Sequence, residues 1–177
     1  MKVIDNFIDQ SSFNQLQQYC FNKISWKYQE NVVGFKSDEP FAQESKDCFQ
    51  FVHTFYTSKG PTVDMKVSQH CDALNPVLKQ LNPYYILRIK ANIRTRTPQL
   101  LHSQYHVDCG ANTGQLTAVY YLNTNDGYTL FERGSTRVDS ISNRMVIFDG
   151  SERHCGTSCT DQKVRMVLNL NYLPVKF

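Results

Sequence analysis

The chain has 177 residues with a formal net charge of +3, and it is 41% hydrophobic and 20% charged. This composition excludes collagen, coiled coils and wholesale disorder, and it suits one domain with its own hydrophobic core. No apolar run approaches the ~18 residues of a membrane span, and the N-terminus has no apolar signal core. We therefore expect a cytoplasmic protein with reduced cysteines and no membrane partner.

Two helices are predicted in the first half of the chain. Apolar residues recur at helical spacing within residues 3–23 and again over 67–81. The second segment contains Pro76, which either kinks the helix or occupies its first position, so that the helix starts at Asn75.

Strand patterns begin early and dominate from residue 84 onwards. Residues 26–34 and 48–57 are predicted strands, with a polar loop over 35–47 between them. From residue 84, short alternating segments are separated by Gly, Asn, Asp and Pro, as in a sandwich or jelly roll. The strands predicted in this part are 84–96, 100–107, 115–122, 127–132, 136–140, 144–149, 153–156 and 164–173.

These elements together predict a mainly β protein with flanking helices. Its core would be a jelly roll, or double-stranded β-helix, with the two N-terminal helices packed outside. The sequence contains no internal repeat, low-complexity tract or linker, so we expect a single domain over residues 1–177. Within it, residues 1–83 would support a core formed by residues 84–177.

Within the predicted strand 84–96, residues 87–94 alternate strictly between apolar and polar side chains. One face therefore belongs to a core, and the other faces water or a polar pocket. The basic residues on the polar face could contact nucleic acid or an acidic peptide, although a solvated strand face is the simpler interpretation. These basic residues are Arg88, Lys90, Arg94 and Arg96.

Three residues have the pattern of a metal site. His106 and Asp108 are two apart on a predicted strand, so their side chains point the same way. His154 follows a turn farther along the chain and can supply a third ligand. Two histidines and one carboxylate on one face of a metal are typical of non-haem Fe(II) oxygenases, which keep the remaining positions open.

The remaining histidines, His53, His70 and His102, are expected to be structural or solvated. His102 and His106 have the spacing of a zinc-binding pair on a helix. The strand-like pattern around them and the lack of a glutamate after His102 argue against that site.

Arg165 lies on the polar face of the last predicted strand, where a guanidinium can bind a carboxylate at two points. The three candidate metal ligands, followed by Arg165 on eight predicted strands, form a pattern that resembles the 2-oxoglutarate and Fe(II)-dependent dioxygenases. The resemblance is strongest to the prolyl 4-hydroxylase branch and its small phage and bacterial relatives. Three sequence blocks between the ligands add to the resemblance: Tyr120-Tyr121-Leu122-Asn123, Gly127-Tyr128-Thr129-Leu130-Phe131 and Asn143-Arg144-Met145-Val146-Ile147-Phe148-Asp149.

The resemblance implies a role for several residues. His106, Asp108 and His154 would bind iron, and Arg165 would hold the distal carboxylate of 2-oxoglutarate. Tyr121 is similar to a tyrosine that hydrogen-bonds the same carboxylate in hypoxia-type prolyl hydroxylases.

Asn92 resembles an asparagine that contacts the cosubstrate in the nucleic-acid demethylase branch. In that branch a tyrosine follows two positions later, but this chain has Arg94 there. Arg94 could therefore bind the cosubstrate or face the primary substrate.

The implied function is hydroxylation of an unactivated C–H bond, with release of succinate and CO₂. The cofactors would be Fe(II), 2-oxoglutarate and O₂, with ascorbate as a further candidate, and the substrate a protein or peptide residue such as proline. Two alternatives remain open: a nucleic-acid demethylase of the same superfamily, or a non-catalytic jelly-roll module for binding or structure. Substrate choice is expected to depend on loops 35–47, 58–65 and 96–103.

Overall fold

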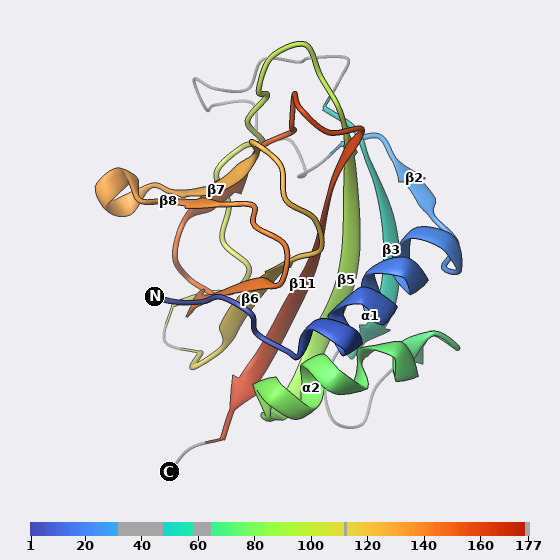
Figure 1. Cartoon of the computed structure of the whole chain (residues 1–177). Helices are drawn as coiled ribbons and strands as arrows, with labels where there is room; N and C mark the ends of the chain where they lie inside the picture. The colour runs from blue at the N-terminus through green and yellow to red at the C-terminus, as the bar shows by residue number, and fades with distance from the viewer. Residues whose placement is uncertain (32–47, 59–64, 112, 176–177) are drawn as a thin grey trace.

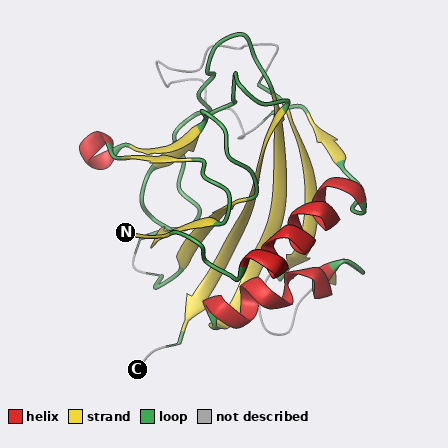
Figure 2. Cartoon of the chain, in the orientation of Figure 1, coloured by secondary structure: helices red, strands yellow, loops and turns green. Residues whose placement is uncertain are grey.

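The computed structural model describes residues 1–31, 48–58, 65–111 and 113–175, and these form two antiparallel sheets with helices on one side (Figures 1 and 2). In the described residues the major sheet has the order β1-β9-β6-β11-β5-β3-β2, with β4 paired to β3, and the minor sheet has the order β10-β7-β8. The strands are β1 (Lys2–Ile4), β2 (Lys27–Gln29), β3 (Gln50–Thr57), β4 (Lys66–Val67), β5 (Pro83–Thr95), β6 (Leu116–Tyr121), β7 (Tyr128–Phe131), β8 (Arg137–Asp139), β9 (Arg144–Asp149), β10 (His154–Gly156) and β11 (Val164–Pro174). The mainly β prediction is confirmed.

The helices of the described residues precede β5 in the chain. They are α1 (Gln10–Asn22), the 3₁₀ helix η1 (Cys71–Leu74) and α2 (Asn75–Leu81), and a 3₁₀ turn η2 (Arg133–Ser135) follows later. Of the two alternatives for the second helix, the chain adopts the one in which Pro76 lies in the first turn. The prediction of a helix from residue 67 is wrong, because Val67 pairs with Tyr56 in the sheet.

The two faces of the major sheet have different neighbours. One face packs against the helices, and its core includes Phe13 and Leu16 of α1, Val77 of α2, and Leu168 and Leu170 of β11. Each of these fully buried apolar side chains contributes roughly 1.5–3 kcal/mol to stability. The opposite face meets the minor sheet through a smaller cluster: Val119, Tyr121, Phe131, Val138, Val146, Phe148 and Val167.

The predicted strand 100–107 is not formed as a strand. Residues of this segment make only isolated bridges to the chain around β10, from His102 to Thr157 and from His106 to His154. Side chains bond to backbone groups of this segment: the Leu101 N–H donates to the Ser158 hydroxyl, and the Leu101 carbonyl accepts from Arg94 as well as from the Ser158 N–H. Such side-chain bonds compete with regular pairing and explain the irregular path.

Some expectations concern residues that the structure does not describe. Loop 35–47 and most of loop 58–65 lie outside the described residues, as does the end of the predicted strand 26–34. All six cysteines are described, and they are free thiols. None of the helices in the described residues is both long and apolar enough to cross a membrane.

Candidate metal centre

A polar cavity lies between the two sheets, against the faces of β5 and β11 that the helices do not cover. The alternation of both strands explains most of its chemistry, because most apolar side chains point to the helices and the polar ones to the cavity, with Val167 of β11 as an apolar exception. The ionisable residues that line it are Arg88, Lys90, Arg94, His106, Asp108, His154 and Arg165.

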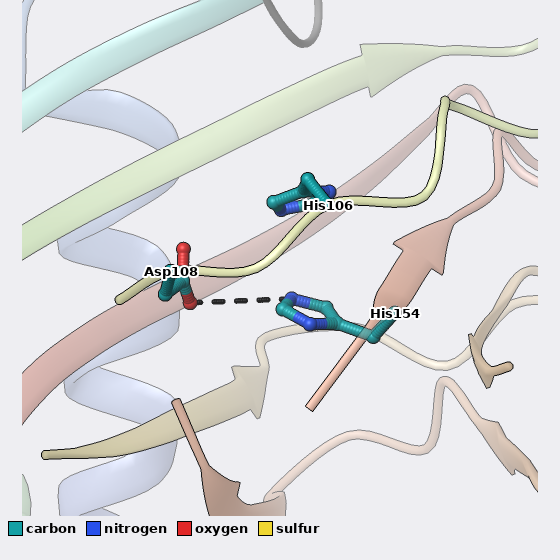
Figure 3. A group of neighbouring side chains, drawn as sticks. All are labelled: His106, Asp108 and His154. Carbon is teal, nitrogen blue, oxygen red and sulfur yellow. Dashed lines mark ion pairs between the residues drawn. The ribbon is translucent and has the colours of Figure 1, made fainter. Parts of the chain in front are cut away.

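The three predicted metal ligands meet in this cavity (Figure 3). One ligand atom from each of His106, Asp108 and His154 lies within 4.8 Å of the other two. His154 Nε2 is 4.0 Å from Asp108 Oδ2, and the two imidazole centroids are 4.4 Å apart. Paired backbone hydrogen bonds of 3.0 Å between His106 and His154 hold the two histidines side by side.

Both histidine rings are oriented by backbone carbonyls. The Nδ1 of His154 donates to the Glu152 carbonyl at 2.9 Å, and the Nδ1 of His106 donates to the Gln104 carbonyl at 3.3 Å. In a neutral ring, such a bond places the proton on Nδ1 and leaves Nε2 available to a metal. Burial, together with the neighbouring His106, lowers the pKa of His154, so its ring is neutral at pH 7.

Asp108 is held by three side chains. Its Oδ2 accepts hydrogen bonds from Thr117 at 2.7 Å and from Asn171 at 3.0 Å, and its Oδ1 pairs with Arg88 at 3.2 Å. Burial raises the pKa of this carboxyl, but three groups outweigh burial and lower the pKa overall. They are His154, which is charged in the acid range where a carboxyl titrates, the Thr117 hydroxyl and the charge of Arg88. The carboxylate is therefore ionised and fixed in direction, as a metal ligand requires.

At another part of the cavity Arg165 is buried, with 5% of its surface exposed. Its Nε donates to Ser140 at 2.8 Å and its Nη2 to Thr129 at 3.4 Å. Gly127 leaves space for it, because a Cβ there would lie 2.7 Å from Arg165 Cδ. The guanidinium is thus positioned by contacts that leave donors for a ligand.

The other two predicted cosubstrate residues have different surroundings. Tyr121 is fully buried outside the cavity lining, and its hydroxyl donates to Thr129 at 2.8 Å and to the Val138 carbonyl at 3.3 Å. Its ring lies under Arg165, with 5.6 Å from the guanidinium carbon to the centroid. Asn92 lines the cavity, and its buried Oδ1 has no hydrogen-bond partner in the described part of the chain.

The interpretation of the basic face of β5 as solvated is wrong for two of its residues. Arg94 is only 5% exposed, and Lys90 is buried enough that its pKa falls to about 8, mainly through loss of hydration and partly through repulsion from Arg88. The minor sheet and the segment before β6 cover this face and convert it into the cavity wall. Arg96, beyond the end of β5, is exposed.

Comparison with known proteins places this geometry in context. No protein-family profile and no curated protein sequence matches the chain. Solved structures do match. A prolyl hydroxylase from Trichoplax adhaerens, in complex with a peptide fragment of hypoxia inducible factor, has a TM-score of 0.62 at 13% identity over 97% of this chain and 82% of that one.

Two bacterial structures are similar to the same degree. A prolyl-4-hydroxylase from Pseudomonas putida has a TM-score of 0.60 at 12% identity, over 98% of this chain and 92% of that one. An oxidoreductase of the 2OG-Fe(II) oxygenase family from Burkholderia pseudomallei has a TM-score of 0.60 at 11% identity, over 92% and 77% of the two chains. The chain has the 2-oxoglutarate and Fe(II) oxygenase fold. The resemblance noted in the sequence is confirmed at the level of the fold.

The residues that line the cavity have the chemistry needed to bind iron and a dicarboxylate. Two imidazoles and an ionised carboxylate are a donor set that Fe(II) accepts, and they converge on one point of the cavity wall. Two buried polar atoms that lack a hydrogen-bond partner among the described residues, Asn92 Oδ1 and Arg94 Nη2, belong to residues of the same cavity. Such atoms are costly unless a ligand or water satisfies them.

The sequence analysis missed the residues that support Asp108, namely Arg88, Thr117 and Asn171. The signal for Arg88 and Asn171 was present, since both lie on polar faces of alternating strands and pair directly across β5 and β11. Thr117 lies in a segment that is mostly apolar, and nothing in the sequence separates it from a packing residue.

Proposed function

We propose that the chain is an Fe(II)- and 2-oxoglutarate-dependent dioxygenase that hydroxylates an unactivated C–H bond and releases succinate and CO₂. The observation that carries the proposal is one cavity with the His106, Asp108 and His154 cluster and the buried cation of Arg165 in its wall. When bound, iron would supply the oxidation of the C–H bond, with 2-oxoglutarate and O₂ as cosubstrates.

The chain's own residues would bind and orient the reactants. The three ligands hold iron on one side and leave its other positions open. Arg165 binds the distal carboxylate of 2-oxoglutarate, and Tyr121 packs beneath its guanidinium and supports its position. Asn92, with its free side-chain oxygen, lies on the wall that the cosubstrate would contact. Phe131 and Phe148 pack around His154 and exclude water from that ligand.

The proposed substrate is a residue of a protein or peptide, with proline as the first choice. Support comes from the two prolyl hydroxylases of the same fold, one of them in complex with a peptide fragment. The basic strand face, which supported the nucleic-acid alternative in the sequence, now has another explanation, because Lys90 and Arg94 lie in the cavity wall.

The cosubstrate site is tested without oxygen. Addition of Fe(II) and then 2-oxoglutarate to the purified protein should produce a visible metal-to-ligand charge-transfer band. The band should disappear in His154→Ala and weaken in Arg165→Ala. His102→Ala and Arg96→Ala are matched controls, since both residues are exposed, and both should retain the band. A folded wild type without the band would refute the proposal and favour a binding or structural module.

The substrate is tested separately by mass spectrometry on a panel of proline-containing peptides, with O₂ present. We expect peptides to gain the mass of one oxygen atom while 2-oxoglutarate is converted to succinate. Turnover of nucleobases or free amino acids alone would contradict the peptide assignment while leaving the reaction class intact.

A further inference from the structure

Two buried arginines face each other in the cavity wall. Arg94 of β5 is the direct cross-strand partner of Arg165 of β11, and each is 5% exposed. Like charges directly opposite one another destabilise a sheet, and burial makes the repulsion stronger. Burial lowers the pKa of Arg94 to about 10 and the charge of Arg165 contributes, so Arg94 remains protonated at pH 7. Arg165 is also a cation, because a guanidinium in a protein is not deprotonated. An anion between them would offset this cost.

The two guanidinium groups converge on one point of the wall. Arg94 Nη1 donates to the carbonyls of Leu101 at 3.1 Å and Gly156 at 3.2 Å, which hold its plane. A Cβ on Gly156 would lie 3.4 Å from Arg165 Nη1. Both arginines therefore lie against the same glycine, and that glycine itself lines the cavity.

One nitrogen of this pair has no partner. Arg94 Nη2 is buried, and no hydrogen bond to it exists within the described residues. An unpaired charged donor in a buried position loses its hydration without compensation. Arg94 Nη1 already donates to two carbonyls, whereas Nη2 has both of its hydrogens available to a ligand.

We infer that Arg94 is a second binding residue for the distal carboxylate of 2-oxoglutarate, alongside Arg165. This inference rests on the proposed function and answers the question that the sequence left open for Arg94. The position along β5 favours the cosubstrate over the primary substrate: Arg88, six residues away on the same face, holds the metal ligand Asp108, whereas Arg94 lies opposite Arg165. Two arginines make the site selective for a 2-oxoacid with a second carboxylate.

The test compares two probes on the iron-loaded protein without oxygen. One is 2-oxoglutarate, and the other is 2-oxovalerate, which has the same chain length but no distal carboxylate. Arg94→Met should weaken 2-oxoglutarate binding about ten- to a hundredfold, the usual effect of losing a hydrogen bond between charged groups. Its affinity for 2-oxovalerate should be unchanged. Arg96→Met is the matched control and should affect neither dissociation constant.

If Arg94 has only a structural role, Arg94→Met should weaken the binding of both probes equally, or lower the melting temperature without changing the preference for 2-oxoglutarate over 2-oxovalerate. Either result overturns the inference. Arg165→Met tests it without altering Arg94, in case the first variant does not fold. This variant should still prefer 2-oxoglutarate to 2-oxovalerate, because Arg94 remains, and complete loss of the preference would overturn the inference. If the wild type binds neither 2-oxoacid, the proposed function fails as well. If it binds 2-oxoglutarate through Arg165 alone, only this inference fails.

Discussion

Gly127 determines whether Arg165 can occupy its position in the cavity wall, and Gly127→Ala tests this directly. A Cβ at this residue would lie 2.5 Å from the Ser158 carbonyl oxygen and 2.7 Å from Arg165 Cδ. Real Cβ atoms essentially never approach other atoms so closely, so something must move. The Ser158 oxygen belongs to the backbone, and moving Arg165 does not relieve that contact, so the backbone must shift and the Arg165 side chain must move as well.

The effect of Gly127→Ala on stability and on 2-oxoglutarate affinity depends on how far the backbone at Ser158 and the side chain of Arg165 move. Forcing an extra methyl group into a well-packed site costs typically 1–3 kcal/mol. If the backbone yields, this cost lowers stability, and each 1 kcal/mol lowers the melting temperature by roughly 2–4 °C in a chain of this size. If Arg165 yields, its bonds to the cosubstrate carboxylate are lost, and 2-oxoglutarate affinity falls by about ten- to a hundredfold. Because the added Cβ meets both groups, we expect both effects.

The assay combines thermal unfolding with an anaerobic titration of the iron-loaded protein by 2-oxoglutarate. Gly110→Ala is the matched control, because a Cβ at Gly110 has no atom within 4 Å and its backbone needs no positive φ. The reasoning is refuted if Gly127→Ala equals Gly110→Ala in both melting temperature and 2-oxoglutarate affinity. That result would mean that Arg165 and the loop adjust without cost.

Three further predictions concern the metal site and the core. His154→Ala should abolish Fe(II) binding in equilibrium dialysis, whereas His102→Ala should bind as the wild type does, and retained binding in the first variant would remove His154 from the ligand set. Thr117→Val keeps the shape but removes a hydrogen bond to Asp108, so Fe(II) affinity should fall about ten- to a hundredfold by titration, and an unchanged affinity would show that Asp108 needs no such support. Leu168→Ala should cost about 2–5 kcal/mol in urea unfolding, and a loss below about 1 kcal/mol would mean that the core collapses around the cavity.

The sequence predicted the fold where local pattern and tertiary environment agree. The alternation of β5 and β11 identified which side chains share a face of the sheet. The apolar face is confirmed, because Ile89 and Leu168 lie in the core between the major sheet and the helices. Strands bounded by clear turn residues were found to within a few residues. The segment 100–107 also has a strand-like pattern, but backbone groups of Leu101 bond to the side chains of Arg94 and Ser158, contacts that the local pattern does not reveal.

The candidate metal ligands were accessible to sequence reasoning because their chemistry is rare and their spacing is local. His106 and Asp108 are two residues apart, and His154 has the residue type that completes a known donor set. Their metal binding remains a prediction. The support for Asp108 was not accessible, because Thr117 and Asn171 are 54 residues apart and become neighbours only when β6 pairs with β11.

The basic face of β5 shows why periodicity alone cannot separate a surface from a site. A period of two says that Arg88, Lys90 and Arg94 point to the same side of a sheet, but it does not say what lies on that side. Solvent would make these residues a diffuse positive surface, whereas a second sheet makes them the wall of a cavity in which each charge needs a partner. Arg88 has such a partner in Asp108, and Arg94 Nη2 has none within the described chain. Because the minor sheet covers the polar face of β5, residues that could have been a solvated surface form a buried site that requires an anionic ligand.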